Sequence, residues 1–213
     1  MKGLFLDSIY KTIDSIKLLI LVLFVIGVGI IGFVDSQFIL QAFISSIFLS
    51  ISVSALISVR KDISSKWYKY EISLPVDRKV IVESKFLAFL FWLVVSIVLA
   101  VGFMGIVVFL KGYQYFDFGM RDILTLFFLD VSFSLSFCSL FYVGLYLLGL
   151  EKCDVLVIIC IILAVACMLA VIYLLNVMHV SIENGRMFIL ASAAILFIVG
   201  MNISQKLYCS KEL

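Results

Sequence analysis

The sequence predicts an all-α membrane protein, with one transmembrane domain over residues 1–213 that crosses the bilayer six times. Its 213 residues are 65% apolar and 14% charged, with a single proline, and the mean hydropathy is +1.28. Soluble globular chains are about 45 to 50% apolar and about 25% charged. A water-soluble domain of this size could not bury so many apolar side chains, and this excludes a soluble fold.

Six long apolar runs mark the predicted spans, because about 20 apolar residues cross a bilayer once. The fourth run is interrupted only by Asp130 and the fifth only by His179. The polar segments between the runs are short, so no second domain is expected. The predicted spans lie near residues 18–34, 36–59, 86–110, 123–150, 155–182 and 187–205.

Residues 1–16 precede the first span and carry an amphipathic helical pattern. The apolar residues Leu6, Ile9, Ile13 and Ile16 fall on one face of a helix. This pattern is typical of an interfacial helix that lies along the membrane surface. No small-residue cleavage site follows the apolar run, so we expect a retained elbow helix rather than a signal peptide.

The distribution of Lys and Arg predicts the orientation of the spans. Thirteen of the sixteen basic residues fall in the amino terminus, the loop 60–85, the loop 151–154 and the carboxyl tail. Only three fall in the alternate set of loops. Basic residues accumulate in cytoplasmic loops, so both termini and the loop 60–85 are predicted to be cytoplasmic.

The loop 60–85 predicts a short cytoplasmic helix at residues 65–74. Ser64 or Ser65 can cap its start, Pro75 ends it, and Asp77 is expected to cap the next helix. One interpretation is an aromatic belt whose lysines bind anionic lipid; the other is a helix that docks into a soluble partner. The apolar ridge of this helix comprises Trp67, Tyr70 or Glu71, and Leu74, beside Lys66, Lys69 and Ser73.

The segment Leu74 to Leu87 resembles the start of the third span in short bacterial ABC transporter type-2 permeases. It contains a Leu-Pro turn, an Arg, an Ile-Val pair and a Lys followed by an aromatic residue. The opening residues 1–4 and Tyr10 are similar too, whereas Asp7 stands where many members carry a basic residue. Among permeases of this size, those of phenol-soluble modulin exporters and of antimicrobial-peptide resistance transporters are similar.

The resemblance implies a function and partners. It implies a permease of the bacterial cell membrane that forms a homodimer or heterodimer and exports an amphipathic or hydrophobic substrate such as a peptide toxin. The helix 65–74 would be the coupling helix seated in a separate ABC ATP-binding subunit, which would bind ATP and Mg. The coupling residues would then be Lys66, Trp67, Lys69, Tyr70, Glu71, Leu74, Pro75 and Arg78.

Polar residues within the spans are candidates for a translocation path. Ser46, Ser50, Ser54 and Ser58 recur every fourth residue, which suits either close helix packing or a polar wall. Asp130 is a functional candidate because ionisable residues are rare in membranes. Alternatively, residues 116–130 lie at the interface and leave Asp130 in water.

Enzymatic and metal chemistry are not expected. His179 is the only histidine, and the sequence has neither a nucleophile elbow nor a phosphate-binding GxxxxGK[ST] loop. The cysteines lack CxxC spacing, and a disulfide framework is not expected. A nucleic-acid partner is not expected either. The alternative to transport is an assembly factor or sensor whose basic loop binds lipid or a partner.

Overall fold

A computed structural model describes residues 2–33, 37–67, 76–112, 120–149, 152–179 and 181–210. Within these ranges the chain is helical and contains no strand, which confirms the all-α fold class. Five helices are long and apolar enough to span a membrane, or six when the bent α1 is counted. The helices are α1 (Lys2–Phe33), α2 (Gln37–Ser64), α4 (Arg78–Lys111), α5 (Met120–Leu148), α6 (Cys153–Val177) and α7 (Ile182–Ser210).

The first helix is bent. Its two parts, Gly3–Ile13 and Ile16–Gly32, meet at 45°. The bend falls where the sequence predicts that the elbow helix ends and the first span begins. The face buried by the first part includes Ile9 and Thr12, whereas Leu6 is exposed. Part of the predicted apolar face thus packs inside the bundle while Leu6 remains exposed, and the interfacial position of this helix stays a prediction.

Two helices extend beyond their predicted spans at the same end of the molecule. α2 continues to Ser64, past the predicted span end at Val59, and α4 begins at Arg78, directly after Asp77 as the sequence predicts, and runs into the span predicted from Phe86. An apolar run predicts only the part of a helix that lies inside the bilayer. Backbone hydrogen bonding continues beyond that part, so the helix can end several residues later in polar sequence. Asp77 stands at the N-cap position of α4, but its side chain makes no capping hydrogen bond, contrary to expectation.

α5 lies in the middle of the bundle and packs against α2, α4, α6 and α7. The hydroxyl of Ser139 on α5 donates a 2.8 Å hydrogen bond to the carbonyl of Leu196 on α7. This close approach requires glycine at position 200. A Cβ at this position would overlap the Ser139 hydroxyl and would lie 3.3 Å from the Cα of Ser139. Aromatic packing continues the interface, with Phe86 of α4 against Phe197 and Tyr142.

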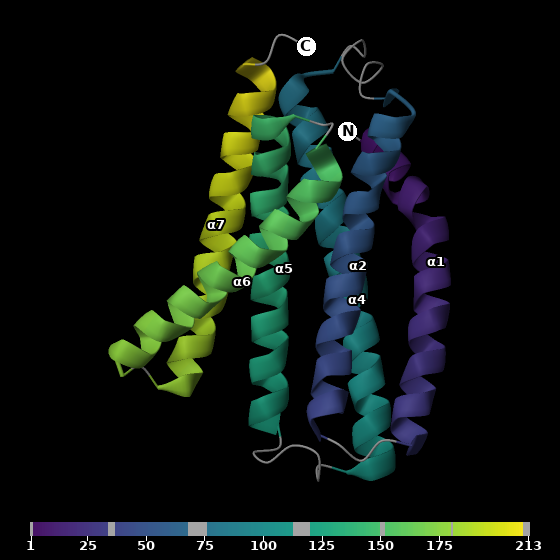
Figure 1. Cartoon of the computed structure of the whole chain (residues 1–213), viewed down its shortest axis with the longest axis vertical. Helices are drawn as coiled ribbons and strands as arrows, with labels where there is room; N and C mark the ends of the chain where they lie inside the picture. Colours follow the sequence, from purple (N-terminus) through teal and green to yellow (C-terminus); the bar gives the residue numbers. More distant parts are fainter. Residues whose placement is uncertain are drawn as a thin grey trace.

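The outer surface of the bundle is apolar. α6 leans away from the other helices (Figure 1), and only 22% of its spanning window is buried, against 62% for α2. Its outward side chains include exposed Val155, Ile158, Ile162 and Leu169. Such a surface is compatible with lipid rather than with water.

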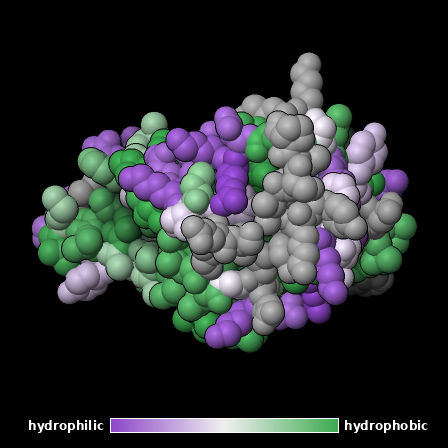
Figure 2. Space-filling view, turned by 90° about the horizontal axis from the view of Figure 1, so that it is seen from above, coloured by the Kyte–Doolittle hydropathy of each residue, from purple (hydrophilic) through white to green (hydrophobic). Residues whose placement is uncertain are grey.

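Most basic residues in the described part of the chain lie at one end of the bundle. α1 begins, α2 ends, α4 begins and α7 ends at the same end, together with the turn between α5 and α6 (Figure 1). Seen onto this end, Figure 2 shows hydrophilic side chains over much of the described surface. The fold thus groups the first residues of α1 and the last residues of α7 with the described parts of the loop 60–85, as the charge pattern predicts, and we call this the basic end.

Candidate coupling end and intramembrane site

A buried ionic cluster fastens three helices together at the basic end. Nζ of Lys11 on α1 lies 2.5 Å from a carboxylate oxygen of Asp62 on α2. Nζ of Lys85 on α4 lies 3.5 Å from the other oxygen of the same carboxylate. Asp62 is only 4% exposed, and Asp7 adds a second partner for Lys11 at 2.5 Å. We call Lys11, Asp62 and Lys85 the ionic cluster.

Further hydrogen bonds hold the amino-terminal part of α1 against α2 and α4. Nε1 of Trp92 donates to the hydroxyl of Thr12 at 3.1 Å, and Thr12 is fully buried. The ammonium of Lys61 donates to the backbone carbonyl of Lys11. The elbow is therefore attached by side chains of both neighbouring helices.

The ionic cluster reaches the start of the predicted coupling helix. α2 ends at Ser64, Lys66 adopts a left-handed backbone with φ of 56°, and the half-buried Trp67 follows. Nζ of Lys11 lies 4.6 Å from the centre of the Trp67 ring, a cation–π distance. The same ammonium thus contacts Asp62 and Trp67.

The rest of the predicted coupling helix lies outside the described residues. Lys69, Tyr70, Glu71, Leu74 and Pro75 belong to that part, while Arg78 begins α4. The hydroxyls of Ser64 and Ser65 both donate to the carbonyl of Lys61. These two serines therefore hydrogen-bond back onto α2, and most of the helix that they are predicted to cap lies outside the described residues.

Three of the four serines in the predicted stripe hydrogen-bond within their own helix, and the side chain of Ser58 lies outside the described part of the structure. Ser46, Ser50 and Ser54 donate to backbone carbonyls three or four residues earlier in α2. The hydrogen bonds that cross to α5 come from the neighbouring serines. Ser45 donates to Asp130 at 3.1 Å, and Ser52 donates to Ser134 at 3.0 Å. Of the stripe, Ser54 is buried and Ser46 is exposed, so these serines do not share one environment.

Asp130 lies within a continuous spanning helix. α5 runs unbroken from Met120 past Asp130, and Ile123–Leu148 qualifies as a membrane span. The carboxylate is half-buried and bonded to α2 through Ser45. These contacts hold Asp130 against α2, the intramembrane and the interfacial interpretations of residues 120–130 both stay predictions, and residues 116–119 lie outside the described part.

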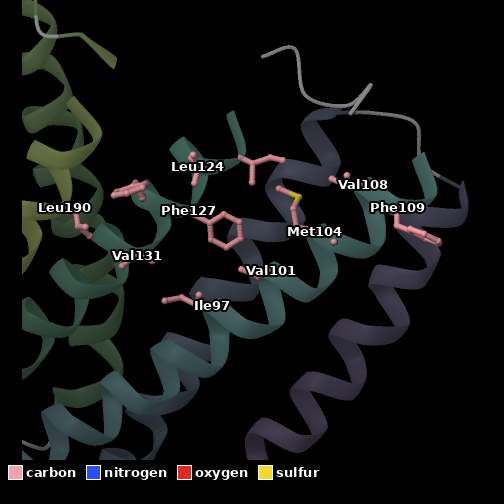
Figure 3. A pocket seen from close by; sticks show the side chains of 12 residues that line it. Ile97, Val101, Met104, Val108, Phe109, Leu124, Phe127, Val131 and Leu190 are labelled. Atoms are coloured by element: carbon pink, nitrogen blue, oxygen red, sulfur yellow. The ribbon is translucent and has the colours of Figure 1, made fainter. Parts of the chain in front are cut away.

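An apolar cavity of about 780 Å³ adjoins this region. It lies between the halves of α4 and α5 that are far from the basic end, with Leu190 of α7 at one side. Figure 3 shows the ring of Phe127 between Val131 and Met104. Since Phe127 and Val131 lie within one turn of Asp130, the carboxylate and the cavity occupy neighbouring parts of α5.

Sequence reasoning did not find the ionic cluster or the Ser45–Asp130 bond. In the sequence, Lys11 and Lys85 stand out only as basic residues that report on topology, and Asp62 belongs to no motif. One signal was present, because an acidic residue at the end of a long apolar helix needs a partner when it is buried. The identity of that partner depends on helix packing.

The remaining candidates form no second site. His179 is exposed at the end of α6 with φ of 50°. Among the described residues, no group of three or more His, Cys, Asp or Glu side chains could hold a metal ion. All five cysteines are free thiols.

The fold and its polar contacts are those of a multi-pass membrane protein with a basic end. The chain belongs to the ABC-2 family transporter protein family, whose model matches residues 3–209. It is therefore a transmembrane subunit of an ABC transporter, and this family implies an ABC ATP-binding partner. Comparison with curated proteins and with solved structures gave no match.

Proposed function

We propose that the chain is the permease of an ATP-driven exporter in the bacterial cell membrane. Two permeases, identical or related, would form the path, and two separate ATPase subunits would bind ATP and Mg. The substrate would be amphipathic or hydrophobic, such as a peptide toxin or an antimicrobial peptide. Family membership over residues 3–209 supports the transporter class.

The observation that carries the coupling role is the contact between the ionic cluster and Trp67. Movement of residues 65–74 by an ATPase would act on Trp67, on Lys11 beneath its ring, and through Asp62 on α2 and α4. An ATPase docked at the basic end would thus be connected to three helices through side chains in direct contact. The coupling residues proposed beyond Trp67 are those that the family resemblance implies.

The test is co-purification of a co-expressed ABC ATPase with Trp67→Ala permease in detergent, with ATP hydrolysis measured in liposomes. Buried aromatic anchors at interfaces typically contribute about 2 kcal/mol or more, so we expect ATPase capture to fall by about 30-fold. The control is Tyr173→Ala, which removes a 69% exposed aromatic from α6. Wild-type capture and hydrolysis by Trp67→Ala would refute the coupling role and favour lipid binding by Lys66 and Lys69.

A further inference from the structure

The apolar cavity has the size and composition of a ligand site. Its volume of about 780 Å³ falls within the roughly 300 to 1,000 Å³ of small-molecule pockets. Every residue that lines it is apolar, and these residues come from α4, α5 and α7. An apolar chain is therefore the kind of group that it can enclose.

A carboxylate lies beside this cavity without a cation. Asp130 is half-buried and accepts a hydrogen bond from Ser45, and among the described residues no Lys, Arg or His forms an ion pair with it. Ionisable groups inside a membrane are costly unless they are paired, and they commonly mark substrate pathways. A carboxylate would attract a cationic group and repel an anionic one.

Phe127 connects the carboxylate with the cavity. Its ring lines the cavity and contacts Phe48 of α2 edge-on, with ring centres 5.7 Å apart. Phe48 lies one turn after Ser45, and Asp130 lies one turn after Phe127. One ligand could therefore contact both the apolar wall and the carboxylate, since one helical turn is about 5.4 Å long.

We propose that the cargo of this permease is a single-chain cationic amphiphile whose apolar chain occupies the cavity and whose ammonium pairs with Asp130. This inference rests on the proposed export function and specifies its substrate class. Ser45 positions the carboxylate through its hydrogen bond, and Phe127 forms the boundary between the two halves of the site.

The experiment uses photoaffinity labelling of the full chain in nanodiscs at pH 7. The probes are a diazirine-bearing dodecylamine, the matched dodecanol and a diazirine-bearing phosphatidylethanolamine, and peptide mapping reports labelling of α4 and α5. The wild-type chain should label with the amine about tenfold more than with the alcohol, which is the change that one hydrogen bond to a charged group brings.

Three variants test whether the preference for the amine over the alcohol depends on Asp130 and whether labelling depends on the cavity. Asp130→Asn keeps the size of the side chain and should reduce the amine preference to within about twofold. Glu183→Gln removes an exposed carboxylate from α7 and should retain the preference. Val101→Trp fills the cavity and should reduce labelling by both amine and alcohol.

An unchanged amine preference in Asp130→Asn would overturn the proposal. Labelling by phosphatidylethanolamine alone would also overturn it, in favour of a resident lipid. ATPase capture by the wild-type chain is measured on the same preparation. If the amine probe fails to label a chain that still binds the ATPase, only the proposed cargo site is refuted. If the chain does not bind the ATPase, the proposed export function is refuted.

Discussion

Removal of the Asp62 carboxylate should destabilise the fold through the ionic cluster. Asp62→Asn leaves two ammonium groups, of Lys11 and Lys85, without their shared counter-charge. The side chains of these lysines are 21% and 11% exposed, so water screens them weakly. Breaking a buried pair by removing one partner costs about 3 to 5 kcal/mol. Since Lys11 keeps Asp7 and asparagine can still accept a hydrogen bond, we expect a cost near the lower limit, about 3 kcal/mol.

The assay is thermal unfolding of purified permease followed by fluorescence-detected size-exclusion chromatography. For a chain of 150 to 250 residues, about 1 kcal/mol shifts the midpoint by about 2 to 4 °C, which gives a loss of about 6 to 12 °C for Asp62→Asn. The matched control is Asp154→Asn, whose 3.3 Å pair with Arg60 is 69% and 66% exposed. Exposed pairs contribute about 0 to 1 kcal/mol, so the control should shift by less than about 4 °C. Equal shifts for the two variants would refute the structural role of the ionic cluster.

Two further predictions concern packing and topology. Gly200→Ala should lower the unfolding midpoint and Gly102→Ala should not, because only the former methyl group would overlap Ser139; equal midpoints for the two variants would contradict the close approach of α5 and α7. In a Cys209→Ser background, a cysteine introduced at Lys66 should react with a membrane-impermeant thiol reagent only after lysis, whereas one at Ser181 should react in intact cells. Both positions are exposed, and the opposite labelling pattern would invert the topology.

The helical architecture could be predicted from the sequence because apolar runs and basic residues report directly on the bilayer. The bend between Ile13 and Ile16 also follows from a change in pattern, since an amphipathic segment gives way to an apolar one. Each of these features depends on local composition. Packing partners are not needed to predict them.

The polar contacts between helices could not be predicted in the same way. Serines fall on more than one side of α2, so the sequence does not indicate which face of α2 meets α5. The regular spacing of Ser46, Ser50 and Ser54 predicts a face that contacts another helix or a translocation path. In the structure, however, these three hydroxyls donate to backbone carbonyls of α2 itself. Ser45 and Ser52, which lack that spacing, make the hydrogen bonds to α5.

The central claim is that this chain is the membrane subunit of an ABC exporter and works with a separate ATPase. The most direct measurement is purification of the tagged chain in mild detergent from membranes of cells that express it naturally, followed by mass spectrometry and an ATP hydrolysis assay. The proposed function predicts that an ABC ATPase elutes with the chain in equal amount and that the complex hydrolyses ATP. Elution of the intact, folded chain without any ABC ATPase would contradict it.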